Sequence, residues 1–111
     1  MKIVTSWAAA LTLLTSGAAW SMDGNDLVKL IPSYEGNKAD FSAGILMGYV
    51  VGVADIADGI RFCSPPGATN GQNIAIVVKY LRNNPEKWAN SAEVIVMDAL
   101  AKAYPACTNK K

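Results

Sequence analysis

The sequence lacks histidine and carries almost no excess of either charge. Of its 111 residues, 10 are lysine or arginine and 9 are aspartate or glutamate, so the formal net charge is +1. Without histidine the chain has neither the commonest general base nor the commonest metal ligand. A balanced charge also offers nucleic acid no basic face. These absences argue against an enzyme and a nucleic-acid partner, and we predict no catalytic residue, no metal and no cofactor.

Long hydrophobic runs are also missing. The apolar stretch within residues 3–14 is shorter than the about 20 residues that a transmembrane helix needs. It follows Met1-Lys2 and is followed by small residues up to Ser21, which is the order of a secretory signal peptide. We expect residues 1–21 to be cleaved, with a cut before Trp20 as the alternative. Residues 22–111 would then form a single helical domain in the periplasm, away from the membrane.

Cysteine is scarce, since the chain holds only Cys63 and Cys107. An even pair in an exported protein is expected to form a structural disulfide, because the compartment is oxidising. The bond would close a loop of about 45 residues and stabilise a small core by about 4 kcal/mol in the chain-entropy model.

Every strong pattern after residue 21 is helical, so we predict an all-α fold, a compact bundle of about four helices with one disulfide. The expected helices are residues 26–31, 38–58, 70–83 and 84–104. Pro32 should end the first, because proline disfavours helical backbone just before it. Thr69-x-x-Gln72 reads as a capping box that opens the third, and Asn84-Pro85 as the start of the fourth. Residues 62–71 hold two prolines and two glycines and should form a loop.

Apolar spacing predicts which helix faces are buried. The core face of the third helix would be Ile74, Val77, Val78 and Leu81, and that of the fourth Trp88, Ala92, Ile95, Val96, Ala99 and Ala103. A second apolar stripe on the fourth helix consists of Val94, Met97 and Ala101. This second stripe could face the same domain, a second subunit or a foreign protein.

Three glycines draw a bare stripe along the second helix. Gly44, Gly48 and Gly52 are spaced by four residues, and each costs about 1 kcal/mol against alanine inside a helix. Close backbone packing should offset that cost, either against another helix of the chain or against a symmetry mate.

Motifs with chemistry are weak. Asp55 and Asp58 lie three apart on one helix, which would suit paired carboxylates of a hydrolase, but a solvated helix end with Arg61 as counter-ion is the plainer interpretation. Asp23, Asn25 and Asp26 suggest part of a calcium loop that lacks the required glycine and distal glutamate. A binding function is therefore favoured.

An ordered set of residues covers nearly all of the chain after residue 21. In order, it reads Gly44-x3-Gly48-Tyr49-x2-Gly52, Phe62-Cys63-x-Pro65, Gln72, Val78-x-Tyr80-Leu81, Asn84-Pro85-Glu86, Ala99-Leu100 and Tyr104-Pro105-x-Cys107. The set resembles the Rap/Tai family of periplasmic immunity proteins. The sequence departs from that pattern at Ala106, where the family usually has proline.

The resemblance implies an all-helical, disulfide-linked protein that is typically a homodimer, in agreement with the glycine stripe and the second apolar stripe. It further implies an immunity protein that neutralises a peptidoglycan amidase, an NlpC-type cysteine peptidase delivered by a type VI secretion system. The implied mode of action is steric, because a helix of one subunit grips the toxin while a loop of the other plugs its catalytic cleft.

Two segments are candidates for contact with such a toxin. The first is the loop of Ser64, Pro65, Pro66, Gly67, Ala68, Thr69 and Asn70, which prolines stiffen and Cys63 anchors. The second is the turn after the third helix, with Tyr80, Arg82, Asn83, Glu86 and Trp88 as possible contacts. A plain interhelix loop and core aromatic residues are the structural alternatives. For a dimer seam the candidates are Gly44, Gly48, Gly52, Val94 and Met97.

A periplasmic acid-stress chaperone of the HdeA kind is the alternative function. Such proteins are also small, helical, exported and dimeric. Their acid response depends on many titrating carboxylates, whereas this chain has 9 acidic residues and no histidine. Their first cysteine also lies near the mature N-terminus, whereas Cys63 lies mid-chain.

Overall fold

A computed structural model describes residues 21–108 of the chain. Its elements are α1 (Gly24–Glu35), α2 (Phe41–Ala57), α3 (Asn70–Asn83), the short 3-10 helix η2 (Pro85–Lys87) and α4 (Ala92–Ala103). Within residues 21–108 there is no β-strand beyond two isolated bridges. The all-α bundle of four helices is therefore confirmed. The expected signal peptide, residues 1–21, lies outside the described residues except for Ser21.

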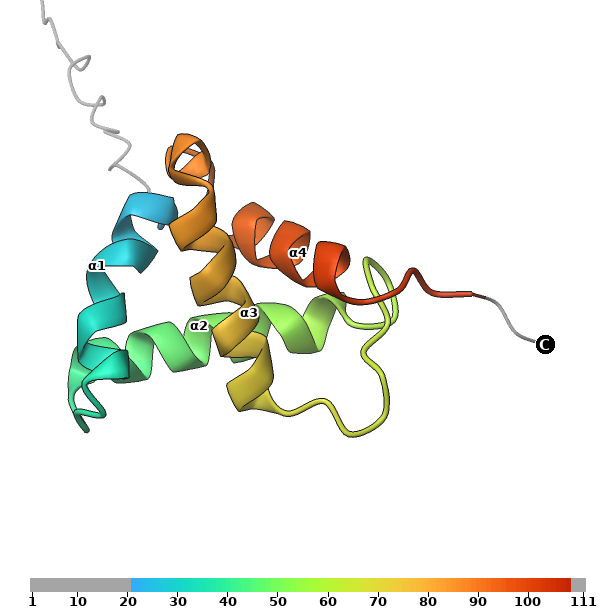
Figure 1. Cartoon of the computed structure of the whole chain (residues 1–111), viewed down its shortest axis with the longest axis horizontal. Coiled ribbons are helices and arrows are strands. Elements are labelled where there is room, and N and C mark those ends of the chain that lie inside the picture. The colour runs from blue at the N-terminus through green and yellow to red at the C-terminus, as the bar shows by residue number, and fades with distance from the viewer. Residues whose placement is uncertain (1–20, 109–111) are drawn as a thin grey trace, which may run out of the picture.

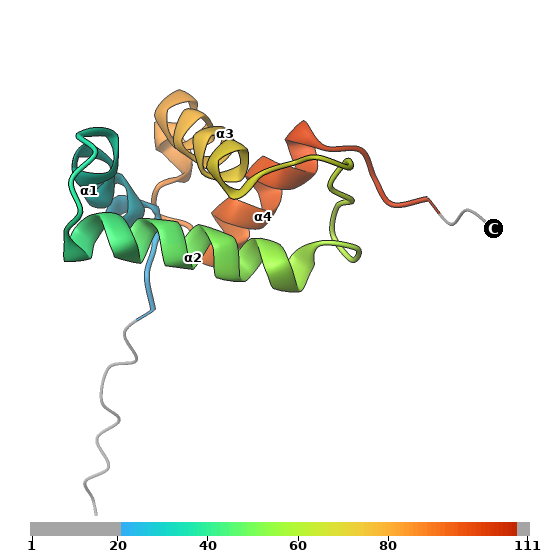
Figure 2. The ribbon, with the colours of Figure 1, turned by 90° about the horizontal axis from the view of Figure 1, so that it is seen from below.

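Helix α2 forms a base on which the other three α-helices lie. In Figure 1 it runs across the lower part of the molecule, and Figure 2 places α1, α3 and α4 along one side of it. All three pack against α2, and α3 also packs against α4. One side of α2 is consequently buried by the rest of the chain, while the opposite side is left to solvent.

The hydrophobic core lies between α2 and the helices above it. Its buried apolar side chains come from all four helices and from the loop after α2. They are Leu27, Ile31, Ala43, Leu46, Val50, Ala54, Ala57, Phe62, Ile74, Val77, Val78, Leu81, Ala92, Ile95, Val96, Ala99 and Leu100. The predicted core face of α3 is confirmed in full. Because each fully buried Leu, Ile, Val or Phe side chain contributes about 1.5–3 kcal/mol, this set supplies most of the folding drive.

Polar side chains fix where the helices begin. In α3 the Gln72 N–H donates to Thr69 Oγ1 at 3.1 Å and the Thr69 N–H to Gln72 Oε1 at 2.9 Å, which confirms the predicted capping box. The helix therefore starts at Asn70, and Gly71 belongs to its first turn rather than to the loop. Helix α2 starts at Phe41 and not at Lys38, because Asp40 accepts the Ala43 N–H at 2.9 Å and acts as the N-cap.

Helix α1 is twice as long as the sequence pattern predicts. It also begins with a capping box, formed by Asp23 and Asp26, and it continues through Pro32 to Glu35. The expectation that Pro32 ends the helix is wrong. Proline removes one backbone donor but fits helical φ, and burial of Ile31 together with the Gly36 N–H bond to the Pro32 carbonyl at 2.9 Å maintains the last turn.

Helix α4 begins later than predicted. Asn84-Pro85 opens η2, and α4 itself starts at Ala92. The backbone before α4 pairs instead with the start of α1, where the Gly24 N–H donates to the Asn90 carbonyl at 3.1 Å. This pairing between segments far apart in sequence interrupts the helix, and no local pattern announces it.

Two residues of the expected core stripe of α4 are therefore misplaced. Trp88 precedes the helix, and its indole N–H donates to the Leu81 carbonyl at 2.8 Å. An added Cβ on Gly24 would lie 2.7 Å from the Trp88 Cα, so the turn at Trp88 and the start of α1 are in tight contact. Ala103 lies in the last turn of α4 and is exposed, whereas Leu100 takes the buried position.

Pro32 offers a test of the α1 geometry. Its side chain is exposed, so Pro32→Ala removes no packing and restores a backbone donor inside the helix. We expect the free energy of unfolding to rise by up to about 3 kcal/mol in urea denaturation. Pro85→Ala is the matched control, since proline is tolerated at the first position of η2 and no gain is expected there. A loss of stability in Pro32→Ala would contradict the continuous helix.

Candidate functional site

The loop between α2 and α3 is anchored at its start by the C-terminal segment. Cys63 and Cys107 form a disulfide with their Cα atoms 4.9 Å apart, as predicted. The Cys63 N–H also donates to the Pro105 carbonyl at 3.1 Å. Next to the disulfide, Phe62 is fully buried, and its ring centre lies 5.9 Å from that of Tyr104. The base of the loop is thus held covalently, by the backbone and by aromatic packing.

The tip of the loop is a tight turn. The Ala68 N–H donates to the Pro65 carbonyl at 3.1 Å, and Gly67 has a φ of +89°. Proline at the second position and a positive-φ glycine at the third are typical of a type II turn. Pro65, Pro66 and Gly67 are exposed there. Of the predicted Ser64–Asn70 segment, Thr69 and Asn70 are the N-cap and first residue of α3.

One further bond closes the loop onto the end of α2. The Ser64 N–H donates to Asp58 Oδ1 at 2.9 Å, so this carboxylate has a structural partner. The spacing in the sequence suggested Asp55 and Asp58 as a possible carboxylate pair. In the structure Asp58 is the C-cap residue of α2. Within residues 21–108, no three acidic or cysteine side chains gather as a metal site. No helix among the same residues is long and apolar enough to cross a membrane.

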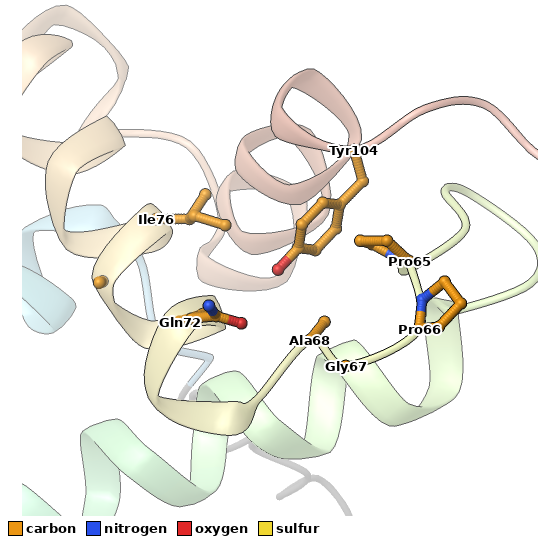
Figure 3. A pocket seen from close by; sticks show the side chains of 8 residues that line it. Pro65, Pro66, Gly67, Ala68, Gln72, Ile76 and Tyr104 are labelled. Carbon is orange, nitrogen blue, oxygen red and sulfur yellow. The ribbon is translucent and has the colours of Figure 1, made fainter.

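A hollow of about 450 Å³ opens between the loop, α3 and the end of α4. It is lined by Pro65, Pro66, Gly67, Ala68, Gln72, Ala75, Ile76 and Tyr104. Figure 3 shows the Tyr104 ring between Ile76 and the two prolines. The Tyr104 hydroxyl donates to Asn73 Oδ1 at 2.6 Å, and burial, together with the charge of Asp58, raises the pKa of Tyr104. The ring is therefore held in place as one wall of the hollow.

A second groove, of about 340 Å³, lies between α3 and α4. It is lined by Ile76, Lys79, Tyr80, Asn83, Asn84, Ala99, Lys102 and Ala103. Ile76 lines both hollows, and we call the two together the α3–α4 furrow. Sequence reasoning named the loop and the turn after α3 as separate candidates. The furrow brings them onto one surface, because the stripe Ile76, Tyr80 and Asn83 on α3 faces α4.

The other residues of the predicted second contact lie outside the furrow. Arg82 forms a two-pronged ion pair with Glu35 of α1, with one N–O distance of 2.6 Å, and this bond lowers the pKa of Glu35. Glu86 is exposed on η2. Trp88 is committed to the contacts with Leu81 and α1 described above. Tyr80 and Asn83 are therefore the members of this set that line the furrow.

The glycine stripe lies on the opposite side of the molecule. Gly44, Gly48 and Gly52 face solvent, and a Cβ added to any of them meets nothing within 4 Å. The expectation that another helix of the same chain crosses closely here is wrong for the described residues. Large apolar side chains share this exposed face, since Phe41 is 82% exposed and Ile56 is 77% exposed. The free-energy cost of three glycines in a helix is thus not offset by close packing within one copy of the chain.

The second apolar stripe of α4 is divided between core and surface. Met97 and Ala101 are partly buried against the core, and Val94 is 38% exposed. Met97 also accepts a contact from the Arg61 guanidinium at 3.7 Å through its sulfur. The same domain is therefore one partner of this stripe, and Val94 remains available to another molecule.

Fold and surface together define a small all-α protein stapled by one disulfide, with a stiff exposed loop beside an apolar furrow. A model of the family described as Rap1a immunity proteins matches residues 23–107. The chain belongs to the Rap1a immunity protein family, which confirms the resemblance found in the sequence. A comparison with curated proteins found no match.

The disulfide can be tested as the anchor of the loop. Replacing both residues, as Cys63→Ser with Cys107→Ser, should lower the free energy of unfolding by about 2–4 kcal/mol. The helices should persist, since the core is built from other side chains. Hydrogen exchange should accelerate at the backbone amides of positions 63, 64 and 68 and remain slow in α3. Unchanged exchange in the loop would contradict the anchoring role.

Proposed function

We propose that this chain is a periplasmic immunity protein that binds a peptidoglycan amidase effector of a type VI secretion system and blocks it sterically. Membership of an immunity family supports a protein partner, and the absence of histidine favours inhibition without chemistry. The observation that carries the proposal is the exposed type II turn of Pro65, Pro66 and Gly67, held at its base by the disulfide.

A stiff loop suits the obstruction of a cysteine-peptidase cleft. A segment that is already ordered loses little conformational entropy when it docks, so more of its contact energy appears as affinity. Two adjacent prolines also make the loop a poor peptidase substrate, because proline has no backbone N–H to donate to the enzyme. The furrow beside the loop gives the enzyme surface outside the cleft a second place of contact.

The partner can be identified by affinity purification of the tagged mature chain from the periplasm of its own cells, followed by mass spectrometry. We expect one small peptidoglycan amidase in stoichiometric amount, and inhibition of its activity by the purified chain. A spread of unrelated proteins that grows as the pH falls would contradict the proposal and favour a chaperone.

The loop itself is tested by the double substitution Pro65→Gly with Pro66→Gly. Each proline restricts the free chain by about 0.4–1 kcal/mol, so inhibition should weaken by roughly 3- to 30-fold. Pro105→Gly beside the disulfide is not a suitable control, since glycine would loosen the backbone whose carbonyl accepts the Cys63 N–H. Pro85→Gly on η2 is the better match, and it should leave inhibition unchanged. Equal inhibition by the loop variant and the parent chain would overturn the role of the loop.

We also propose that the solvent-facing side of α2 is a homodimer seam. This side carries Phe41, Gly44, Gly48, Gly52 and Ile56, so it combines large exposed apolar groups with bare backbone. Small residues at a four-residue spacing allow two helices to approach closely, and the contact would cover the apolar side chains. The seam lies across the molecule from the furrow, so both surfaces could be occupied at once.

Gly48→Ala tests the seam, because its expected effect on the single chain is opposite to its expected effect on the dimer. No atom lies within 4 Å of the added methyl group in the single chain, so the helix should gain up to about 1 kcal/mol. At a close seam the same methyl group should cost about 1–3 kcal/mol, which weakens the dimer roughly 5- to 150-fold in analytical ultracentrifugation.

Gly71→Ala in the first turn of α3 is the control for this substitution. The nearest atom to its added Cβ is Thr69 Oγ1 at 3.9 Å, which is an ordinary contact. This variant should leave self-association unchanged. If Gly48→Ala associates as strongly as the parent chain, the seam lies elsewhere.

A further inference from the structure

Most carboxylates of the chain have a partner within the fold. Asp23, Asp26 and Asp40 accept backbone N–H groups at helix starts. Glu35 and Asp98 form ion pairs with arginines. These negative charges are therefore partly compensated by contacts within the fold.

The lysines of α3 and α4 are arranged differently. Lys79 on α3 and Lys102 on α4 are both exposed, and both line the groove between these helices. Neither pairs with a carboxylate among residues 21–108. Asp98 is one turn before Lys102, but it lies 3.8 Å from Arg61. No acidic side chain lines the groove. Two lysines therefore line it, one from each helix, and Lys79 also lines a neighbouring hollow together with the paired Glu35 and Arg82.

The floor of the groove is apolar. Ile76 and Tyr80 of α3 meet Ala99 and Ala103 of α4, and the small alanines keep the groove open. A shallow trough between two helices accepts the apolar side of a third helix or of an extended segment. Charges at the rim then select partners of the opposite sign and accelerate their association.

We propose that the groove between α3 and α4 binds an acidic amphipathic segment of a partner protein. Its apolar side chains would lie on Ile76 and Tyr80, while its carboxylates reach Lys79 and Lys102. The proposal rests on the proposed function only for the identity of that partner, the effector. It specifies the chemistry of the segment that meets the furrow beside the loop.

A pair of synthetic helical peptides tests the groove without the effector. In one, glutamates flank a stripe of leucines, and in the other glutamine replaces every glutamate. Titrated into the isotope-labelled mature chain, the glutamate peptide should shift the amide resonances of Lys79, Tyr80 and Lys102. It should bind at least about tenfold more tightly at low salt than at high salt, and the glutamine peptide should bind at least about fivefold more weakly.

Charge-reversal variants complete the test. Lys79→Glu with Lys102→Glu should abolish the preference for the glutamate peptide, whereas Lys79→Arg with Lys102→Arg should keep it. Lys29→Glu with Lys38→Glu makes the same change in net charge away from the groove, and it should behave as the parent chain does.

Several results would overturn the proposal. These are equal binding of both peptides, no binding of either, shifts outside the groove, or a preference that survives reversal at Lys79 and Lys102. Shifts of the same amides with vesicles of anionic phosphatidylglycerol but not with the peptide would favour a membrane occupant instead. Concentration-dependent shifts without peptide would favour a second copy of the chain. An amidase that the parent chain fails to inhibit would refute the proposed function and leave these outcomes unaffected.

Discussion

Burial of Phe62 beside the Cys63–Cys107 disulfide is the constraint on which the candidate site depends. The buried Phe62 side chain holds the chain after α2 against the core, and the disulfide links it covalently to the segment that follows α4. Tyr104 links this region to α3, because its ring packs on Phe62 and its hydroxyl donates to Asn73 of α3. The loop therefore cannot move far from the α3–α4 pair, and its turn stays beside the furrow.

This arrangement leaves α2 with two distinct sides. Its buried side holds α1, α3 and α4, and the furrow lies along α3 and α4. Its outer side carries bare glycines and exposed Phe41 and Ile56. The proposed homodimer and the proposed effector contact need two surfaces that do not compete. Their separation across one helix supports the combination of a dimer seam with an effector-binding face.

Local patterns predicted those parts of the fold that local interactions determine. Helix α3 has the predicted bounds, because its capping box and apolar face agree. The start of α4 could not be predicted, since pairing of Asn90 with Gly24 interrupts the helix and joins segments far apart in sequence. The end of α1 was mispredicted at Pro32, because burial of Ile31 outweighs the loss of one backbone N–H donor.

The candidate site was predictable in composition but not in shape. Prolines, a glycine and an adjacent cysteine identified the loop as stiff and anchored. The furrow depends on how α3 crosses α4, so a stripe such as Ile76, Tyr80 and Asn83 could not be distinguished from core by spacing alone. Likewise, the spacing of the glycines indicated close packing, yet their exposure emerges only once the other helices are placed on α2.

The most direct test of the account is hydrogen exchange of the chain with and without its co-purified effector. We predict that binding protects the backbone of residues 63–68 and of α3 and α4 along the furrow, while exchange on the outer side of α2 is unchanged. Protection confined to α2, with the loop and furrow exchanging as in the free chain, would contradict the assignment of the effector-binding face.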